Sequence, residues 1–570
     1  MTYTDVAVGQ KSERLSLSRR LTTFMLAAGL SAIVGGGVFA AFADPAKPAT
    51  AKKPNFLIIV ADDLGFSDLG AFGGEIQTPN LDRLAFEGVR LTSFHSAPMC
   101  APTRAQLLTG ADNNRIGLGQ MSEPTPARYK GIAGFEGALS DNVATLPEIL
   151  RDNGYRTVQS GKWHLGGALE KDPSRRGFQY SFSPAKGGFR DNGRDVGKLA
   201  DNVDSSDEFT TRFIDKLKQS RAAGDDKPFF GYLAFTAPHW PMQAPAASIA
   251  KYRGRYDKGY EVLRAERIKR QAELGLIDAN APHVFSDEVK PWKDLTPQEK
   301  AYYIAAREVY SGMVDRLDYN VGRLVAYLKS TGEYDNTVIL FVSDNGAAGR
   351  DLSRDQKPEG RFLKADNRPE NIGNPTSFAS IGAGWAEAAS APAKLYKQHA
   401  SEGGTRVAAF ITYRGFANKG GIGRAYGHVR DATPTFLELA GIPVPKDEYN
   451  GKRIFPVTGR SQVAWLTGKA DRVYPIDAPV GVMFAGSRSM RKGDWKLLSL
   501  RNEGWRLYNL ASDPGETKDL TAAHPEKAQE LLADWTAYAR ENVDPAFAEA
   551  FDQDFGGKRK SVATQPGSID

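Results

Sequence analysis

The sequence predicts an α/β fold in which a large, mostly parallel sheet is covered by helices on both faces. Short apolar runs rich in β-branched residues alternate along the chain with segments of helical spacing. Four of these runs end directly at polar or charged residues, as happens where parallel strands reach the ligand-binding edge of a sheet. Short strand-like segments and one helical segment follow near the C-terminus, and they predict a second, smaller unit.

The composition is that of a globular protein and argues against a protein that binds nucleic acid. Hydrophobic residues make up 41% of the 570-residue chain and charged residues 25%, which is an ordinary balance. The net charge is +6, and the basic residues are scattered along the sequence. We therefore expect a solvated surface and no nucleic-acid partner. The chain has one cysteine, Cys100, so an internal disulfide is impossible.

The N-terminus has the pattern of an export signal. Three arginines precede an uncharged run over residues 21–43 that closes with an A-x-A-like cleavage site. We expect residues 1–43 to be a removed signal peptide and residues 44–53 a flexible linker, so that the mature protein is periplasmic or secreted without stable membrane association. The run is also long enough to span a bilayer, so an uncleaved membrane anchor is the alternative.

Chemically active side chains follow four predicted strands. The strands lie at residues 56–60, 155–159, 229–235 and 337–342, and the residues that follow them are Asp62 and Asp63, Lys162 and His164, His239, and Asp344 and Asn345. Because the carboxyl ends of parallel strands share one edge, we expect these side chains to meet at one rim of the sheet. The remaining five histidines have no such context and receive no role.

The two acidic clusters have a structural and a functional interpretation. Asp62 and Asp63 could form a turn or cap a helix, and Asp344 and Asn345 could belong to a simple turn. Together, after two buried strands, they supply the carboxylate and carbonyl oxygens that suit a hard divalent cation such as Ca²⁺. Zinc is disfavoured because no cluster of histidine and cysteine has its ligand spacing.

The segment that starts at Cys100 predicts a helix with a nucleophile at its N-terminus. Pro102 suits a first helical turn and Gly110 a helix end. The free N–H groups of the first turn stabilise negative charge, and Arg104 suits the oxygens of a bound anion. Charge pairing alone does not distinguish sulfate from phosphate. The alternative for Cys100 is a buried, inert thiol.

Several motifs together resemble one family. The sequence from Cys100 matches throughout the type I sulfatase signature C-x-[P/A]-[S/T]-R-x-x-x-[L/I]-T-G. Residues 161–166 and 237–241 also match sulfatase motifs, and Lys397 with residues 402–406 resembles the family's K-x-x-x-x-E-G-G-x-R. The chain is therefore similar to the formylglycine-dependent sulfatases of the alkaline phosphatase-like superfamily, and among these to the bacterial arylsulfatases.

This resemblance implies an alkaline phosphatase-like fold and hydrolysis of organic, in particular aryl, sulfate monoesters to an alcohol or phenol plus inorganic sulfate. Cys100 would be oxidised to formylglycine (3-oxoalanine) by a formylglycine-generating enzyme during maturation, and the hydrate would attack sulfur. One Ca²⁺ per chain would be bound by Asp62, Asp63, Cys100, Asp344 and Asn345. The implied catalytic residues are Cys100, Arg104, Lys162, His164, His239 and Lys397.

The family also implies how these side chains divide the work. Arg104, Lys162 and Lys397 would offset charge on the sulfuryl oxygens. His239, with Lys397, would protonate the leaving oxygen, and His164 would take the proton whose loss expels sulfate. Lys394 competes with Lys397 by proximity but is out of register with the motif.

Two other functions stay open at this point. The first is a phosphonate monoesterase or phosphodiesterase of the same superfamily, which would share the nucleophile and the metal. The second is a non-catalytic exported anion-binding protein in which Cys100 is unmodified. The complete set of acid–base residues argues against the second.

The domain organisation follows from composition and from the resemblance. We expect a catalytic domain over residues 54–440, an antiparallel-sheet subdomain with a helix over 441–555, and a disordered tail over 556–570. Within the first, the charged residues 251–300 predict a surface insertion. Residues 351–393, rich in Gly, Pro, Asn and Ser, predict a long loop that shapes the substrate entrance.

The C-terminal elements are predicted individually. Paired strands are expected over residues 490–498 and 505–510, followed by a turn at 513–516 and a helix over 525–538. Their order resembles the C-terminal antiparallel sheet plus helix of the sulfatases.

Overall fold

The computed structural model describes residues 52–121, 127–200, 203–354, 360–417, 419–501 and 503–544. The predicted signal peptide, most of the predicted linker and the predicted tail lie outside these residues, so their assignments stay predictions. Among the helices of the described residues, none has both the length and the apolar character needed to cross a bilayer.

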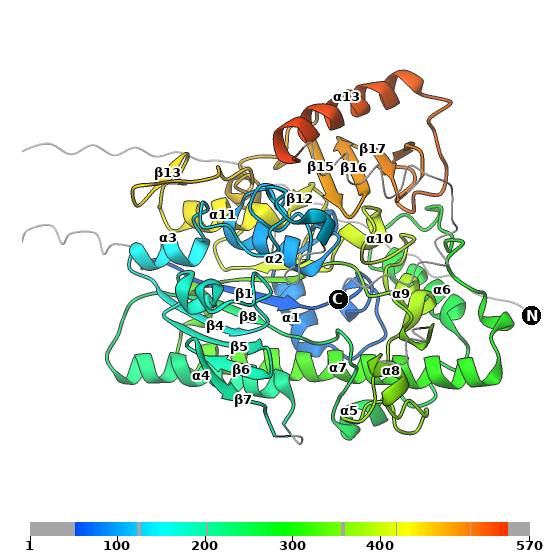
Figure 1. The fold of residues 1–570 in the computed structure, drawn as a ribbon, viewed down its shortest axis with the longest axis horizontal. Coiled ribbons are helices and arrows are strands. Elements are labelled where there is room, and N and C mark those ends of the chain that lie inside the picture. The colour runs from blue at the N-terminus through cyan, green and yellow to red at the C-terminus, as the bar shows by residue number, and fades with distance from the viewer. Residues whose placement is uncertain are drawn as a thin grey trace, which may run out of the picture. The chain divides into compact units, whose positions relative to one another are not determined.

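The main sheet has the predicted α/β architecture (Figure 1). In the described part of the chain it contains ten strands in the order β11-β2-β10-β9-β1-β8-β4-β5-β6-β7. Their bounds are β1 (Asn55–Ala61), β2 (Val89–Leu91), β4 (Arg156–Gly161), β5 (Tyr180–Ala185), β6 (Gly188–Asp191), β7 (Arg194–Gly197), β8 (Phe229–Ala234), β9 (Thr337–Ser343), β10 (Ala409–Thr412) and β11 (Ile422–Gly423). The five central strands β9, β1, β8, β4 and β5 are parallel, whereas β10, β6 and β7 pair antiparallel towards the two edges. The predicted fold class is confirmed.

Strand β1 shows why the sheet is covered on both faces. All seven of its residues are buried. Leu57 and Ile59 belong to one hydrophobic core, whereas Phe56, Ile58 and Val60 belong to a second one. Because alternate side chains of a strand point to opposite faces, the two cores lie on opposite sides of the sheet. Such a strand must be covered by helices on both sides, as is usual for parallel sheets.

Two sets of helices supply these covers. Helices α1 (Pro79–Glu87), α4 (Ser205–Ala222) and α7 (Pro297–Ser330) contribute to the first core. Helices α2 (Cys100–Thr109), α3 (Leu146–Asp152) and α11 (Ala432–Leu439) contribute to the second. Figure 1 shows α4 and α7 on one side of the sheet and α2, α3 and α11 on the other.

The remaining elements are short or belong to connections. They are α5 (Ala246–Ala250), α6 (Tyr260–Glu273), α8 (Arg361–Lys364), α9 (Gly382–Ala389), α10 (Glu402–Thr405), α12 (Val463–Leu466) and the strand pairs β3 (Phe94–His95) with β12 (Gly427–His428) and β13 (Glu448–Tyr449) with β14 (Lys452–Arg453).

The prediction of a surface insertion over residues 251–300 is wrong for helix α6. Arg264 and Arg267 on this helix are 2% and 0% exposed. Arg267 lies 2.8 Å from Asp68 and 2.6 Å from Glu75, two carboxylates in the segment that follows β1. Arg264 donates instead to backbone carbonyl oxygens, among them those of Glu387 and Ala393. The charged helix therefore includes buried cations, and the partners of both are distant in sequence.

The long loop predicted over residues 351–393 is also only partly a loop. It contains α9, whose Trp385 and Ala386 are fully buried in the first core. The small residues of α9 allow it to approach its neighbours closely, because an added side-chain carbon at Gly384 would lie 2.4 Å from the ring of Tyr260.

The C-terminal unit is an antiparallel sheet with a helix packed on it. Strands β15 (Pro479–Phe484), β16 (Ser487–Lys492), β17 (Trp495–Ser499) and β18 (Arg506–Asn509) pair in chain order, and α13 (Pro525–Asn542) shares their hydrophobic core. The first strand predicted here, over residues 490–498, is in fact the β16–β17 hairpin, which turns at Gly493 with a positive φ of 58°. The position of the domain boundary stays a prediction.

Candidate active site

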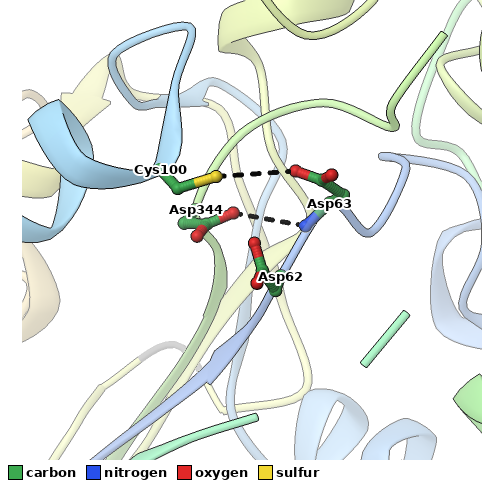
Figure 2. Close-up of side chains that lie close together, drawn as sticks. All are labelled: Asp62, Asp63, Cys100 and Asp344. Atoms are coloured by element: carbon green, nitrogen blue, oxygen red, sulfur yellow. Dashed lines mark hydrogen bonds between the residues drawn. The ribbon is translucent and has the colours of Figure 1, made fainter. Parts of the chain in front are cut away.

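The four strands that carry the predicted side chains are neighbours in the sheet. Their order is β9-β1-β8-β4, and all are parallel, so their carboxyl ends open at the same edge. Asp62, Asp63 and Asp344 meet Cys100 there, and the four groups offer ligand atoms that all lie within 4.8 Å of one another. Figure 2 shows their side chains converging from β1, β9 and the start of α2.

Helix α2 presents Cys100 from its first turn. Every residue of the helix is buried, and it ends where Gly110 adopts a left-handed φ of 69°, as predicted. The Cys100 sulfur lies 3.8 Å from Asp63 Oδ1 and 3.2 Å from Lys397 Nζ. Burial raises the pKa of the Cys100 thiol well above its usual value, and the charge of Asp344 adds to this shift. The side chain is therefore a neutral thiol and not an activated thiolate.

Three cations balance the three carboxylates. Lys162 Nζ lies 2.6 Å from Asp62 Oδ2. Arg104 Nε and Nη2 lie 2.9 Å and 2.8 Å from Asp344 Oδ2. These contacts place two of the predicted sulfate-binding cations directly on two of the predicted metal ligands.

Asp63 is the third carboxylate of this set. Lys397 Nζ lies 2.8 Å from Asp63 Oδ1, which also accepts a hydrogen bond of 2.6 Å from Asn345 Nδ2. Asp63 thereby joins Lys397, which comes from a distant part of the chain, to the strand ends. Three acidic and three basic side chains are thus paired in this site.

Burial affects the pKa values of two of the carboxyls differently. It opposes ionisation of Asp62, but the positive charges of Lys162 and Arg104 outweigh it and hold the pKa of Asp62 well below its usual range. For Asp344, burial and the charge of Asp62 outweigh Arg104 and raise the pKa to about 7. Asp344 is consequently the carboxyl of this cluster that most readily takes a proton near neutrality.

The two predicted histidines flank the cluster. His239 Nε2 lies 3.5 Å from Asp63 Oδ2. Burial lowers the pKa of His239, and burial with the charges of Lys162 and Arg104 lowers the pKa of His164 well below its usual value. Both imidazoles are therefore neutral at neutral pH. Among the described residues, the buried Nδ1 of His164 has no hydrogen-bond partner, so it can accept a proton in the tautomer protonated at Nε2.

Two site residues have an unusual backbone conformation. Asp63 and His164 have φ values of 67° and 66°, in the left-handed region that non-glycine residues rarely adopt. Strained residues of this kind persist only where surrounding contacts hold them, and they gather at functional sites. Each belongs to a segment that leaves a parallel strand and turns sharply at the sheet edge.

Lys397 reaches the site through a tightly packed turn. An added side-chain carbon at Gly403 would lie 2.2 Å from the carbonyl oxygens of Lys394 and Leu395, and one at Gly404 would lie 2.0 Å from that of His399. The glycine pair therefore allows a close approach of backbone segments that a side chain would prevent. The competing Lys394 lies elsewhere, with its Nζ 5.7 Å from the centre of the Tyr508 ring.

One supporting pair was missed by the sequence analysis. The hydroxyl of Tyr310 lies 2.7 Å from Asp68 Oδ2 and 3.1 Å from the carbonyl oxygen of Asp63. Asp68 in turn accepts a hydrogen bond from the backbone of Gly65. Tyr310 thereby fixes the turn that carries Asp63, but a tyrosine in the middle of a long helix gives no sequence signal of such a role.

The donor set fits a hard divalent cation. Asp62 Oδ1 and Asn345 Oδ1 are buried and have no hydrogen-bond partner in the part of the chain that the structure describes, although buried polar atoms are almost always paired. Carboxylate and amide oxygens are the ligands that Ca²⁺ and Mg²⁺ prefer. Asp62, Asp63, Asp344 and Asn345 could therefore hold such an ion, with the side chain at position 100 beside it.

Fold and site together define an α/β protein with a buried cluster of carboxylates and cations at the carboxyl edge of its parallel strands. Residues 54–442 match the family model described as Sulfatase, and the chain belongs to the sulfatase family. This membership implies a metal and a formylglycine, and the buried cluster of Asp62, Asp63, Cys100 and Asp344 is consistent with both.

Individual relatives agree with this assignment. The chain is 42% identical to an uncharacterized sulfatase of Schizosaccharomyces pombe, over 87% of this chain and 95% of the relative. It is 36% identical to an arylsulfatase of Klebsiella aerogenes, over 76% and 95%. The crystal structure of Ps i-CgsB shares the fold with a TM-score of 0.64 at 23% identity, covering 89% of this chain and 98% of that one.

Proposed function

We propose that this sulfatase acts on aryl sulfate monoesters, which it hydrolyses to a phenol and inorganic sulfate, with a formylglycine made from Cys100 as its nucleophile. The observation that carries the proposal is the place of Cys100. It is fully buried in the first turn of α2, 3.2 Å from Lys397 Nζ and within the acidic cluster. A neutral thiol in this place is a poor nucleophile. A formylglycine made from it would lie among the same acidic and basic side chains.

The residues around position 100 divide the chemistry. A hydrated formylglycine would supply a hydroxyl nucleophile, and a divalent cation held by Asp62, Asp63, Asp344 and Asn345 would add positive charge beside it. Arg104 and Lys162, both charged and buried, bind the sulfuryl oxygens and stabilise the charge that develops on them. Because the acidic and basic side chains are equal in number, the added cation makes the site positive and suited to a monoanionic ester.

Proton transfer falls to the other side chains. Lys397 stays protonated because Asp63 and the other acidic groups raise its pKa despite burial. With His239 it faces the leaving oxygen and stabilises or protonates it. His164, neutral and with a free Nδ1, takes the proton whose loss releases sulfate.

An aromatic wall supports the aryl preference. The ring of Trp240 lies beside His239 with ring centroids 4.7 Å apart, and Phe378 packs edge-on against Trp240 at 5.5 Å. Such rings offer a flat apolar surface for a phenolic leaving group. Phe378 comes from the loop predicted to shape the entrance, and the arylsulfatase of Klebsiella aerogenes supports the same substrate class.

The proposal is tested by comparing ester classes on one enzyme preparation. The protein, produced together with a formylglycine-generating enzyme, should hydrolyse 4-nitrophenyl sulfate faster than a hexyl sulfate and faster than 4-nitrophenyl phenylphosphonate. Mass spectrometry of the tryptic peptide should show an aldehyde or its hydrate at position 100. Preference for the phosphorus ester would favour the phosphonate monoesterase alternative, and a free thiol in fully active enzyme would contradict the nucleophile.

Calcium is proposed as the ion, and its affinity should depend on pH. Because the pKa of Asp344 is about 7 in the metal-free protein, an ion must displace a proton below that pH but not above it. We expect the affinity to fall about tenfold for each pH unit below 7 and to be nearly constant above 7. Calorimetric titration with Ca²⁺ measures this. Asp344→Asn should bind more weakly and lose the dependence, and a pH-independent affinity of the wild type would contradict the assignment.

Export and maturation complete the proposal. The arginines and the uncharged run over residues 21–43 support a periplasmic or secreted protein, and Cys100 would meet the formylglycine-generating enzyme during maturation. N-terminal sequencing of the exported protein tests the first point. Asp44 is the expected first residue, and a retained leader would favour the membrane-anchored alternative.

A further inference from the structure

Four ionisable side chains outside the reacting centre form one buried network. Lys496 Nζ on β17 lies 2.8 Å from Glu402 Oε1 and 2.9 Å from Glu516 Oε1. The second oxygen of Glu402 lies 2.9 Å from His95 Nε2. The four residues are between 0% and 4% exposed, so the network is screened from solvent. It joins α10 of the main domain to the C-terminal sheet.

Backbone hydrogen bonds tie the same segment to the C-terminal unit. Glu516 Oε2 accepts a hydrogen bond of 2.9 Å from the backbone N–H of Glu402. Two residues earlier, the N–H of Ala400 donates to the hydroxyl of Ser487 on β16 at 2.7 Å. The backbone N–H groups at both ends of the turn from Ala400 to Glu402 are therefore bound by side chains of the C-terminal unit.

The other end of this segment lies in the reacting centre. The backbone N–H of Lys397 donates to Ala347 at 3.1 Å, and that of Gln398 donates to Pro98 at 2.8 Å. Lys397 Nζ itself lies 3.2 Å from the Cys100 sulfur. Only a few residues thus separate the lysine that faces the nucleophile from the anchor on the C-terminal sheet.

Charge makes Lys496 the key member of the network. Burial opposes its positive charge, but Glu402 and Glu516 outweigh burial and raise the pKa of Lys496. His95 stays neutral at neutral pH, because burial lowers its pKa more than Glu402 raises it. Without Lys496, two buried carboxyl groups would face each other across the joint between α10 and the C-terminal sheet, and the contact would open.

We infer that Lys496 and Glu516 are positioning residues of the active site, which act through Glu402 to hold Lys397 against the leaving-group side of the nucleophile. The inference rests on the proposed role of Lys397 and assigns the C-terminal sheet a part in catalysis. A displaced Lys397 would weaken charge stabilisation at the leaving oxygen, while the sulfuryl oxygens would still contact Arg104 and Lys162.

The test compares Lys496→Met with a matched control on the next strand. Methionine keeps an unbranched apolar side chain and removes only the charge. Lys492→Met removes an equivalent charge from β16, where Lys492 pairs with Glu530 and Asp534 of α13 at 3.0 Å and 3.1 Å, away from the Lys397 segment. Both variants are assayed as folded protein with equal formylglycine content, on 4-nitrophenyl sulfate and on phenyl sulfate, whose leaving group is poorer.

For Lys496→Met we expect kcat on phenyl sulfate to fall about tenfold more than kcat on 4-nitrophenyl sulfate, with KM nearly unchanged, because protonation matters most for the poorer leaving group. Lys492→Met should behave as the wild type. An equal loss on both esters would mean that the network only stabilises the fold, and it would overturn the inference, as would no loss.

If Lys496→Met does not fold, Glu516→Gln carries the test. Its amide keeps the shape and contacts Lys496 with one charge fewer, and a smaller difference between the two esters, about threefold, is expected. If the rate of Glu516→Gln, divided by that of the wild type, is the same for both esters, the inference is overturned. A wild type that hydrolyses neither ester would instead overturn the proposed function, and the inference with it.

Discussion

Cys100→Ser is expected to lower steady-state kcat on aryl sulfates by about three orders of magnitude or more, as loss of a nucleophile usually does. Serine is slightly smaller than cysteine and fits the fully buried position, so the protein should fold. Its single oxygen can attack sulfur to give a serine sulfate ester, but the same carbon then bears no second hydroxyl whose proton His164 could take. Intact-protein mass spectrometry should show one added sulfuryl group per chain.

Thr103→Ser is the matched control for this substitution. It changes a side chain in the same helical turn, where the Thr103 hydroxyl donates to the carbonyl oxygen of Ala97 at 3.0 Å, and serine can make the same bond. We expect activity within about twofold of the wild type, as for most conservative changes. Sustained turnover by Cys100→Ser at the wild-type rate would contradict the proposed nucleophile.

The parts of the fold that the sequence could predict are those with local causes. Strand β1 is a run of large apolar residues buried on both faces, and its observed bounds differ from the predicted ones by one residue at each end. The convergence of Asp62, Asp63 and Asp344 followed because parallel neighbours end at one edge. Helix α2 ends at Gly110 because glycine adopts the left-handed conformation without steric cost.

The parts that the sequence could not predict depend on partners distant in the chain. The charged spacing of α6 is the same whether the helix faces solvent or acidic side chains, and only the fold brings Arg267 to Asp68 and Glu75. The link between Lys496 and Glu402 likewise joins α10 to the C-terminal sheet and has no local pattern. Lys397 was identified only because its motif resembles that of a known family.

The site itself combines parts with local causes and parts that depend on distant partners. Strand ends deliver the proposed metal ligands, so their arrangement follows from the order and direction of the strands in the sheet. Lys397 comes instead from a turn whose glycines leave no space for side chains and whose far end is held by the C-terminal sheet. The position of Lys397 therefore depends on long-range packing, whereas that of the proposed metal ligands depends on the sheet itself.

Lys397→Met is expected to lower kcat by about 10² to 10⁴, the range typical for loss of a general acid, and to affect poorer leaving groups most. The change removes the cation that lies 2.8 Å from Asp63 Oδ1 and 3.2 Å from the Cys100 sulfur. Lys394→Met is the control that separates the two candidate lysines. Because Lys394 lies over the Tyr508 ring, its replacement should lower the free energy of unfolding by at most about 1 kcal/mol and leave activity close to the wild type. Steady-state rates on 4-nitrophenyl and phenyl sulfate decide between the two lysines. A greater loss of kcat for Lys394→Met than for Lys397→Met would assign the role to Lys394.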